Sequence, residues 1–98
     1  MKLNKNKVPA EIVPLLSFAE RWGVGDDFER EIALNKATTA ELEEVAHCLD
    51  EVEDKSLVAW LTGSESQKKP PSDEYLAVTC LTMAVHSAKV KLKKRAHA

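Results

Sequence analysis

Two neighbouring carboxylates follow a glycine at Gly25-Asp26-Asp27, a combination that can hold a divalent metal ion or take part in acid/base chemistry. Such a metal site needs further oxygen ligands at a fixed spacing. In a calcium loop that began at Asp26, the third and fifth ligand positions would be Phe28 and Arg30, neither of which supplies a suitable oxygen. We therefore predict a corner between two helices here, with no metal ion.

His47, Cys48, Cys80 and His86 are the residues that could bind a soft metal ion or supply a nucleophile. Zinc sites use close pairs such as C-x2-C or H-x3-H, and the neighbours His47 and Cys48 would point about 100° apart on a helix. The sequence also lacks a glycine-rich nucleophile elbow, a Walker loop and a dinucleotide fingerprint. We predict that the chain is not an enzyme and has no catalytic residues, no cofactor and no metal ion.

The two cysteines are too few for a disulfide scaffold, so we expect buried free thiols in a reducing cytoplasm. The alternative is a Cys48–Cys80 bridge, and the sequence does not tell whether these two residues are close. The first residues resemble the charged start of a signal peptide, but the following segment contains Glu11 and two prolines and makes a poor apolar region. No segment is long and apolar enough to predict a membrane span.

The elements that position these residues show helical periodicity almost throughout. A first helix ends at Trp22, and Gly23 is expected to close it in the left-handed conformation. Asp26 or Asp27 caps a second helix that reaches about Ala37. The apolar residues expected to pack from this second helix are Phe28, Ile32 and Leu34.

Two further helices follow in the acidic middle of the chain. Thr38 and Glu41 have the spacing of a capping box, which predicts a helix from residue 38 onwards. A short helix after Asp54 is expected to end at Gly63, with residues 63–72 as a loop. The side chains that this short helix is predicted to bury are Leu57, Val58 and Leu61.

The last helix, from Asp73 to about residue 94, is apolar nearly all round in its first half, which is typical of a helix surrounded by others. Ser72 is its predicted cap. The sequence thus predicts an all-α fold, a compact bundle of about five helices with the largely apolar C-terminal helix as its central element. We expect one helical domain over residues 1–98, with a flexible arm at 1–7 and a flexible tail at 95–98.

The charges are unevenly distributed along the chain, although the net charge is only −2. Residues 26–54 carry eleven acids and two bases, whereas residues 55–98 carry eight bases and three acids. We expect a non-enzymatic, cytoplasmic protein-interaction module, an adaptor or accessory protein, whose acidic helical face meets a basic partner of unknown identity. Trp60, which falls off the predicted apolar stripe, is the expected anchor. The predicted partner-binding residues are Glu43, Glu44, Glu51, Glu53, Leu57 and Trp60.

The basic C-terminal segment supports an alternative, a nucleic-acid-associated regulator. Its predicted contacts are Lys89, Lys91, Lys93, Lys94 and Arg95. A helix-turn-helix over residues 39–62 would bring acidic side chains against phosphate, so nucleic acid is the less favoured partner. A third hypothesis is a homo-oligomer in which the basic ends of one copy meet the acidic middle of another. The exposure of Trp60, the oligomeric state and the pathway stay open at this stage.

Overall fold

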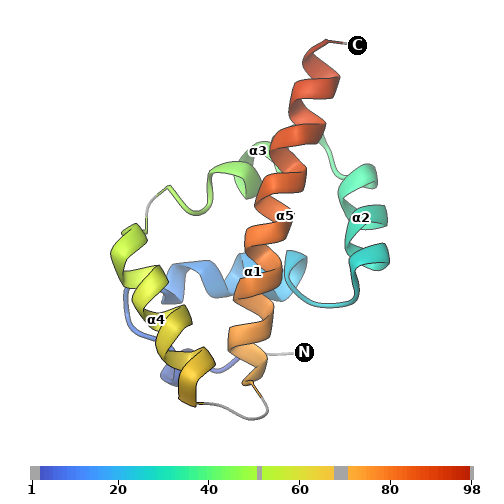
Figure 1. Cartoon of the computed structure of the whole chain (residues 1–98). Helices are drawn as coiled ribbons and strands as arrows, with labels where there is room; N and C mark the ends of the chain where they lie inside the picture. The colour runs from blue at the N-terminus through green and yellow to red at the C-terminus, as the bar shows by residue number, and fades with distance from the viewer. Residues whose placement is uncertain (1–2, 51, 68–70, 98) are drawn as a thin grey trace.

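The chain folds around its C-terminal helix, as the computed structural model shows for residues 3–50, 52–67 and 71–97 (Figure 1). Five α-helices and two short 3-10 turns account for the secondary structure of these residues, which contain no β-strand. The predicted all-α bundle of about five helices is confirmed. In chain order the elements are η1 (Lys5–Lys7), η2 (Val13–Leu15), α1 (Leu16–Trp22), α2 (Asp27–Lys36), α3 (Thr39–His47), α4 (Asp54–Gln67) and α5 (Asp73–Ala96).

Helix α5 is the central element, because α1, α2, α3 and α4 all pack against it. Its buried side chains recur at helical spacing along one side and are mostly small, which lets the neighbouring helices approach closely. They are Ala77, Val78, Leu81, Ala84, Val85 and Ala88. The expectation that other helices surround α5 is wrong, however, since Leu76 and Met83 are each about half exposed on its other side.

Gly23 and Gly25 shape the corner between α1 and α2 for different reasons. Gly23 has a φ of −103°, so it is not the left-handed cap predicted from the sequence. A Cβ atom there would lie 2.0 Å from the carbonyl oxygen of Ala77, so the close approach of α1 to α5 requires glycine. The left-handed residue is Gly25, with a φ of 89°, and the predicted turn into α2 falls there.

Helix α2 buries less of its apolar sequence than predicted. Asp26 caps it as expected, since its side chain accepts a hydrogen bond from the backbone N–H of Glu29. Leu34 is fully buried, but Phe28 is 74% exposed and Ile32 is 39% exposed. The buried face uses Arg30 instead, whose guanidinium pairs with the carboxylate of Asp27 at 2.5 Å. The short apolar pattern of this helix could not reveal which side faced α5.

The N-terminal segment, from Leu3 onwards, packs against the start of α5, whereas the sequence suggested a flexible arm over residues 1–7. Leu3 is only 5% exposed and belongs to the core. The backbone N–H of Asn4 donates a 2.9 Å hydrogen bond to the buried carboxylate of Glu74. The apolar burial and this long-range hydrogen bond together hold the segment in place.

The boundaries of α4 and α5 also differ from the sequence prediction. Helix α4 passes through Gly63 and continues to Gln67, so the predicted loop does not begin at residue 63. Residues 68–70 lie outside the described residues. Helix α5 begins after the predicted Ser72 cap and extends to Ala96, beyond the start of the predicted tail at residue 95.

Candidate protein-interaction surface

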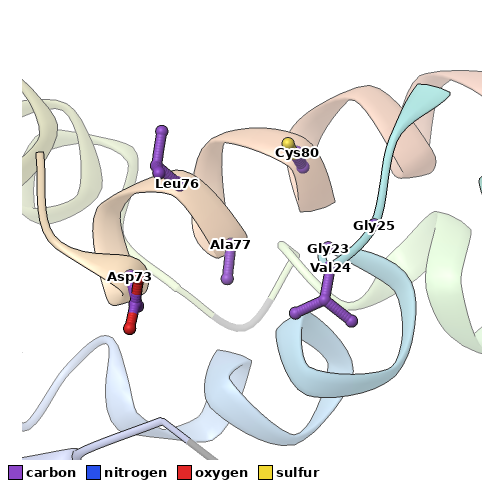
Figure 2. Close-up of a pocket in the computed structure, with 7 residues that line it drawn as sticks. All are labelled: Gly23, Val24, Gly25, Asp73, Leu76, Ala77 and Cys80. Carbon is purple, nitrogen blue, oxygen red and sulfur yellow. The ribbon is translucent and has the colours of Figure 1, made fainter. Parts of the chain in front are cut away.

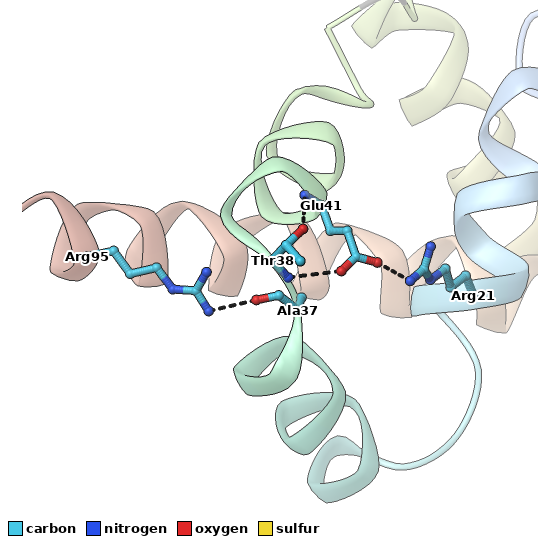
Figure 3. Close-up of polar contacts among 5 residues, drawn as sticks. All are labelled: Arg21, Ala37, Thr38, Glu41 and Arg95. Atoms are coloured by element: carbon cyan, nitrogen blue, oxygen red, sulfur yellow. Dashed lines mark hydrogen bonds and ion pairs between the residues drawn. The ribbon is translucent and has the colours of Figure 1, made fainter.

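Helix α3 carries two exposed acidic side chains, Glu43 and Glu44, and a complete capping box fixes its start (Figure 3). The hydroxyl of Thr38 accepts a hydrogen bond from the backbone N–H of Glu41 at 3.1 Å. The Glu41 carboxylate accepts one in return from the backbone N–H of Thr38 at 2.9 Å. This hydrogen bond is the main reason why the pKa of Glu41 lies below its usual value.

Two arginines from other helices hold the α2–α3 corner from opposite sides, as Figure 3 shows. Arg21 of α1 pairs with the Glu41 carboxylate. Arg95 of α5 donates a 2.8 Å hydrogen bond to the carbonyl oxygen of Ala37 and a 3.1 Å hydrogen bond to the hydroxyl of Thr39. The N-terminus of α3 is therefore held in position by one arginine from α1 and one arginine from α5.

The acidic side chains of residues 26–54 divide into those with a partner inside the molecule and those without one. Glu31 pairs with Lys91 at 2.5 Å, and this contact lowers the pKa of the Glu31 carboxyl. Asp50 lies 2.9 Å from the Nδ1 atom of His47. Glu43 and Glu44 are exposed and have no ion pair or hydrogen bond from their carboxylates among the residues that the structure describes. These two carboxylates are thus available to a partner.

Two hollows flank α3, one on each side of this acidic pair. The first has a volume of about 240 Å³ and combines Glu44 with apolar groups from the N-terminal part of the chain; its lining is Pro14, Phe18, Glu44, His47 and Cys48. The second has a volume of about 450 Å³ and lies between α3 and the end of α5; its lining is Thr39, Glu43, His47, Leu92, Arg95 and Ala96. Helix α3 is therefore a ridge with a carboxylate beside each hollow.

Leu57 and Trp60 do not add an exposed apolar anchor to the surface of Glu43 and Glu44. Glu53 is exposed, whereas Glu51 lies outside the described residues. Leu57 is buried, so it cannot be a surface anchor. Trp60 is partly buried against the core, with its ring centroid 6.5 Å from that of Tyr75. The position of Trp60 on the helical wheel of α4 suggested that it is exposed, but Tyr75 at the start of α5 packs beside its ring.

The basic residues predicted to contact nucleic acid are also divided. Lys91 is 15% exposed at its side chain and bonds to Glu31 and Asn35, at 2.5 and 2.6 Å. Arg95 is engaged at the α2–α3 corner. The remaining lysines of this group, Lys89, Lys93 and Lys94, are exposed and have no ion pair within the described residues.

The largely apolar hollow at the α1–α2 corner offers little chemistry (Figure 2). It measures about 250 Å³ and is lined by Gly23, Val24, Gly25, Asp73, Leu76, Ala77 and Cys80. Asp73 is the single ionisable carboxylate in this lining and has no histidine beside it. We therefore assign no catalytic role to this hollow.

Both cysteines are free and partly buried. Burial is the main cause that raises the pKa of the Cys48 thiol to about 11, which keeps it protonated at neutral pH. Among the described residues, no three histidine, cysteine or carboxylate side chains come together in a way that could hold a metal ion.

Comparison with known proteins gives no relative for this chain: no family model, no curated protein and no solved structure matches it. No helix in the described part of the chain combines the length and the apolarity needed to cross a bilayer.

Proposed function

We propose that the chain is a non-enzymatic protein-interaction module that binds a basic segment of a partner protein along α3. The observation that carries this proposal is the pair Glu43 and Glu44. Both are exposed and have no ion pair within the described part of the chain, whereas their neighbour Glu41 is held by Arg21. Unpaired carboxylates attract a basic partner and increase the association rate and selectivity.

The hollows beside α3 supply the second part of the recognition. Phe18 and Pro14 line the hollow next to Glu44, and an apolar side chain of the partner would lose exposed surface there. This hollow replaces Leu57 and Trp60 as the proposed anchor site. The capping box and the two arginines make α3 rigid at its start, which reduces the entropy lost on binding.

Charge reversal tests the proposal. The double variant Glu43→Lys, Glu44→Lys should lose the partners that the wild-type chain captures from cell extract, identified by quantitative mass spectrometry. The matched control is Glu11→Lys, Glu29→Lys, which changes the net charge equally at two exposed residues outside α3. Retention of every partner by the α3 variant, or equal loss in the control, would contradict the proposal.

The alternative, a nucleic-acid-associated regulator, has weaker support because Lys91 and Arg95 are bonded within the fold, which leaves Lys89, Lys93 and Lys94 without an internal bond among the described residues. Replacing these three lysines by glutamine should then abolish binding to labelled duplex and single strands at low salt. If the wild-type chain binds neither strand, this alternative is excluded.

We further propose that the chain works in the cytoplasm, because a reducing compartment suits its two free thiols. A fluorescent fusion and thiol trapping of freshly lysed cells would test this. An oxidised Cys48 or Cys80 in the trapped protein, or a location outside the cytoplasm, would contradict it.

A further inference from the structure

Helix α5 presents an apolar stripe on a side that no other helix covers in the part of the chain that the structure describes. Leu76, Met83 and Val90 are 48%, 49% and 40% exposed and follow one another at intervals of seven residues. Seven residues make almost two helical turns, so these side chains line up along about 21 Å of the helix. Figure 1 shows α5 passing in front of α1 and α3, and Figure 2 shows Leu76 on the side of α5 opposite to Ala77.

Phe28 of α2 is a fourth exposed apolar side chain, and it lies level with the middle of this stripe. Helix α2 runs parallel to α5, since Glu31 bonds to Ser87 and Asn35 bonds to Lys91 further along. Phe28 lies about one turn before Glu31, just as Met83 lies about one turn before Ser87. Phe28 is therefore level with Met83, and it is 74% exposed.

We propose that these four side chains form the contact between two copies of this chain, whose α5 helices pack antiparallel about a two-fold axis at Met83. This arrangement places Leu76 against Val90 of the second copy and Met83 against its own counterpart. The contact is on the side of α5 opposite to α3, so it is independent of the function proposed above.

The apolar stripe fits a second copy because it is symmetric about its central residue, Met83. A two-fold interface needs the same surface on both copies, with each half complementary to the other half. The stripe meets this condition, since Leu76 and Val90 lie seven residues before and after Met83. Apolar side chains that recur every seven residues are also typical of helices that pack along one another in coiled coils.

The charges at the two ends of the stripe select the antiparallel direction. Asp73 and Lys94 are exposed, lie on the same flank of the stripe, and have no ion pair within the described residues. Antiparallel packing brings Asp73 beside Lys94 of the second copy, at both ends of the contact. Parallel packing would bring like charges together and would also align the two helix dipoles.

The contact is small, so we expect a reversible dimer. One apolar residue per seven buries less than a continuous coiled-coil seam and less than a standard interface. The expected dissociation constant is on the order of 10 to 100 μM.

Sedimentation equilibrium from about 1 μM to about 1 mM tests the dimer with the whole chain. The wild-type chain should shift from monomer to dimer, and Met83→Glu, which places two like charges at the axis, should raise the dissociation constant at least about tenfold. The control Val58→Glu changes an exposed apolar residue on α4 and should dimerise as the wild type does. Circular dichroism checks that both variants are folded.

A monomeric wild-type chain at every concentration, or an unchanged dissociation constant in the folded Met83→Glu variant, would overturn the proposal. Disulfide trapping tests the direction in a Cys48→Ala, Cys80→Ser background that carries Leu76→Cys or Val90→Cys. When the two chains are mixed and oxidised, mass spectrometry should find the cross-link between positions 76 and 90. Cross-links confined to 76–76 and 90–90 would show a parallel pair and overturn the antiparallel arrangement.

Discussion

Three glycines show that one residue type can serve different physical purposes in a small helical fold. At Gly23 the nearby backbone of Ala77 leaves no room for a Cβ atom, and at Gly25 the positive φ favours glycine. Neither reason applies at Gly63, since nothing lies within 4 Å of a Cβ atom added there. The sequence marked Gly23 and Gly63 alike as helix ends. Their distinction depends on helix contacts that the sequence does not display.

Substitution by alanine should therefore have opposite effects at Gly23 and Gly63. Gly23→Ala should lower the free energy of unfolding by about 2 kcal/mol or more, because its Cβ meets backbone that cannot move aside easily. Gly63→Ala should raise it by about 0.5 to 1 kcal/mol, since alanine is the better residue inside α4. Urea denaturation of the variants measures both. A stabilised Gly23→Ala variant would contradict the close packing of α1 on α5.

Cys48 should react slowly with alkylating reagents. With the pKa of its thiol raised to about 11 from the usual 9.0, the thiolate fraction at neutral pH falls about a hundredfold. Alkylation by iodoacetamide, followed by mass spectrometry against a free-cysteine peptide as the standard, should show slow modification at Cys48. A rate equal to that of the peptide would contradict the partial burial of this side chain.

At the scale of the elements, caps were predicted from the sequence much better than helix faces and helix ends. Thr38 with Glu41, Asp26 and Ser72 each cap a helix as their spacing indicated, because a cap is a bond between residues three apart. The exposure of Phe28 and the continuation of α4 through Gly63 depend on distant parts of the chain instead. The candidate surface shows the same limit: the sequence pattern placed Glu43 and Glu44 on an exposed helix face, but it did not indicate the hollows beside them.

The capping box of α3 should contribute both stability and pH dependence. Thr38→Ala should lower the free energy of unfolding by about 1 kcal/mol. The pKa of Glu41 is lowered in the folded chain, so its contribution is present above the usual value of 4.5 and is lost as the pH falls through the lower folded pKa.

Glu41→Gln should keep the capping hydrogen bond and lose this pH dependence. Thermal unfolding of the wild type and the variant on both sides of pH 4.5 measures the difference. The melting temperature of the variant should fall less below this pH than that of the wild type. Parallel pH profiles would show that the Glu41 carboxylate does not stabilise the start of α3.

At the scale of the whole molecule, the fold fixes the N-terminal segment against the start of α5. Leu3 belongs to the core, and Glu74 at the start of α5 accepts the hydrogen bond from Asn4. The lysine-rich composition of the first residues suggested a free arm, because composition does not reveal that one leucine reaches the core. The same view explains the charge pattern: part of the acidic middle and part of the basic end pair with each other, as Glu31 does with Lys91.

Leu3→Ala should therefore lower the free energy of unfolding by about 2 to 3 kcal/mol, as expected for a buried leucine. Lys5→Ala, at an exposed neighbouring position, serves as the control and should have little effect. Urea denaturation measures both variants. A Leu3→Ala variant as stable as the control would restore the flexible arm predicted from the sequence.

The central claim is that Glu43 and Glu44 of α3 bind a basic partner segment, and direct binding to a captured partner tests it most closely. Isothermal titration calorimetry would compare the wild type with the Glu43→Lys, Glu44→Lys variant and with the Glu11→Lys, Glu29→Lys control. We predict at least a tenfold weaker affinity, a loss of about 1.4 kcal/mol, for the α3 variant alone. Equal affinities of the wild type and the α3 variant would contradict the claim.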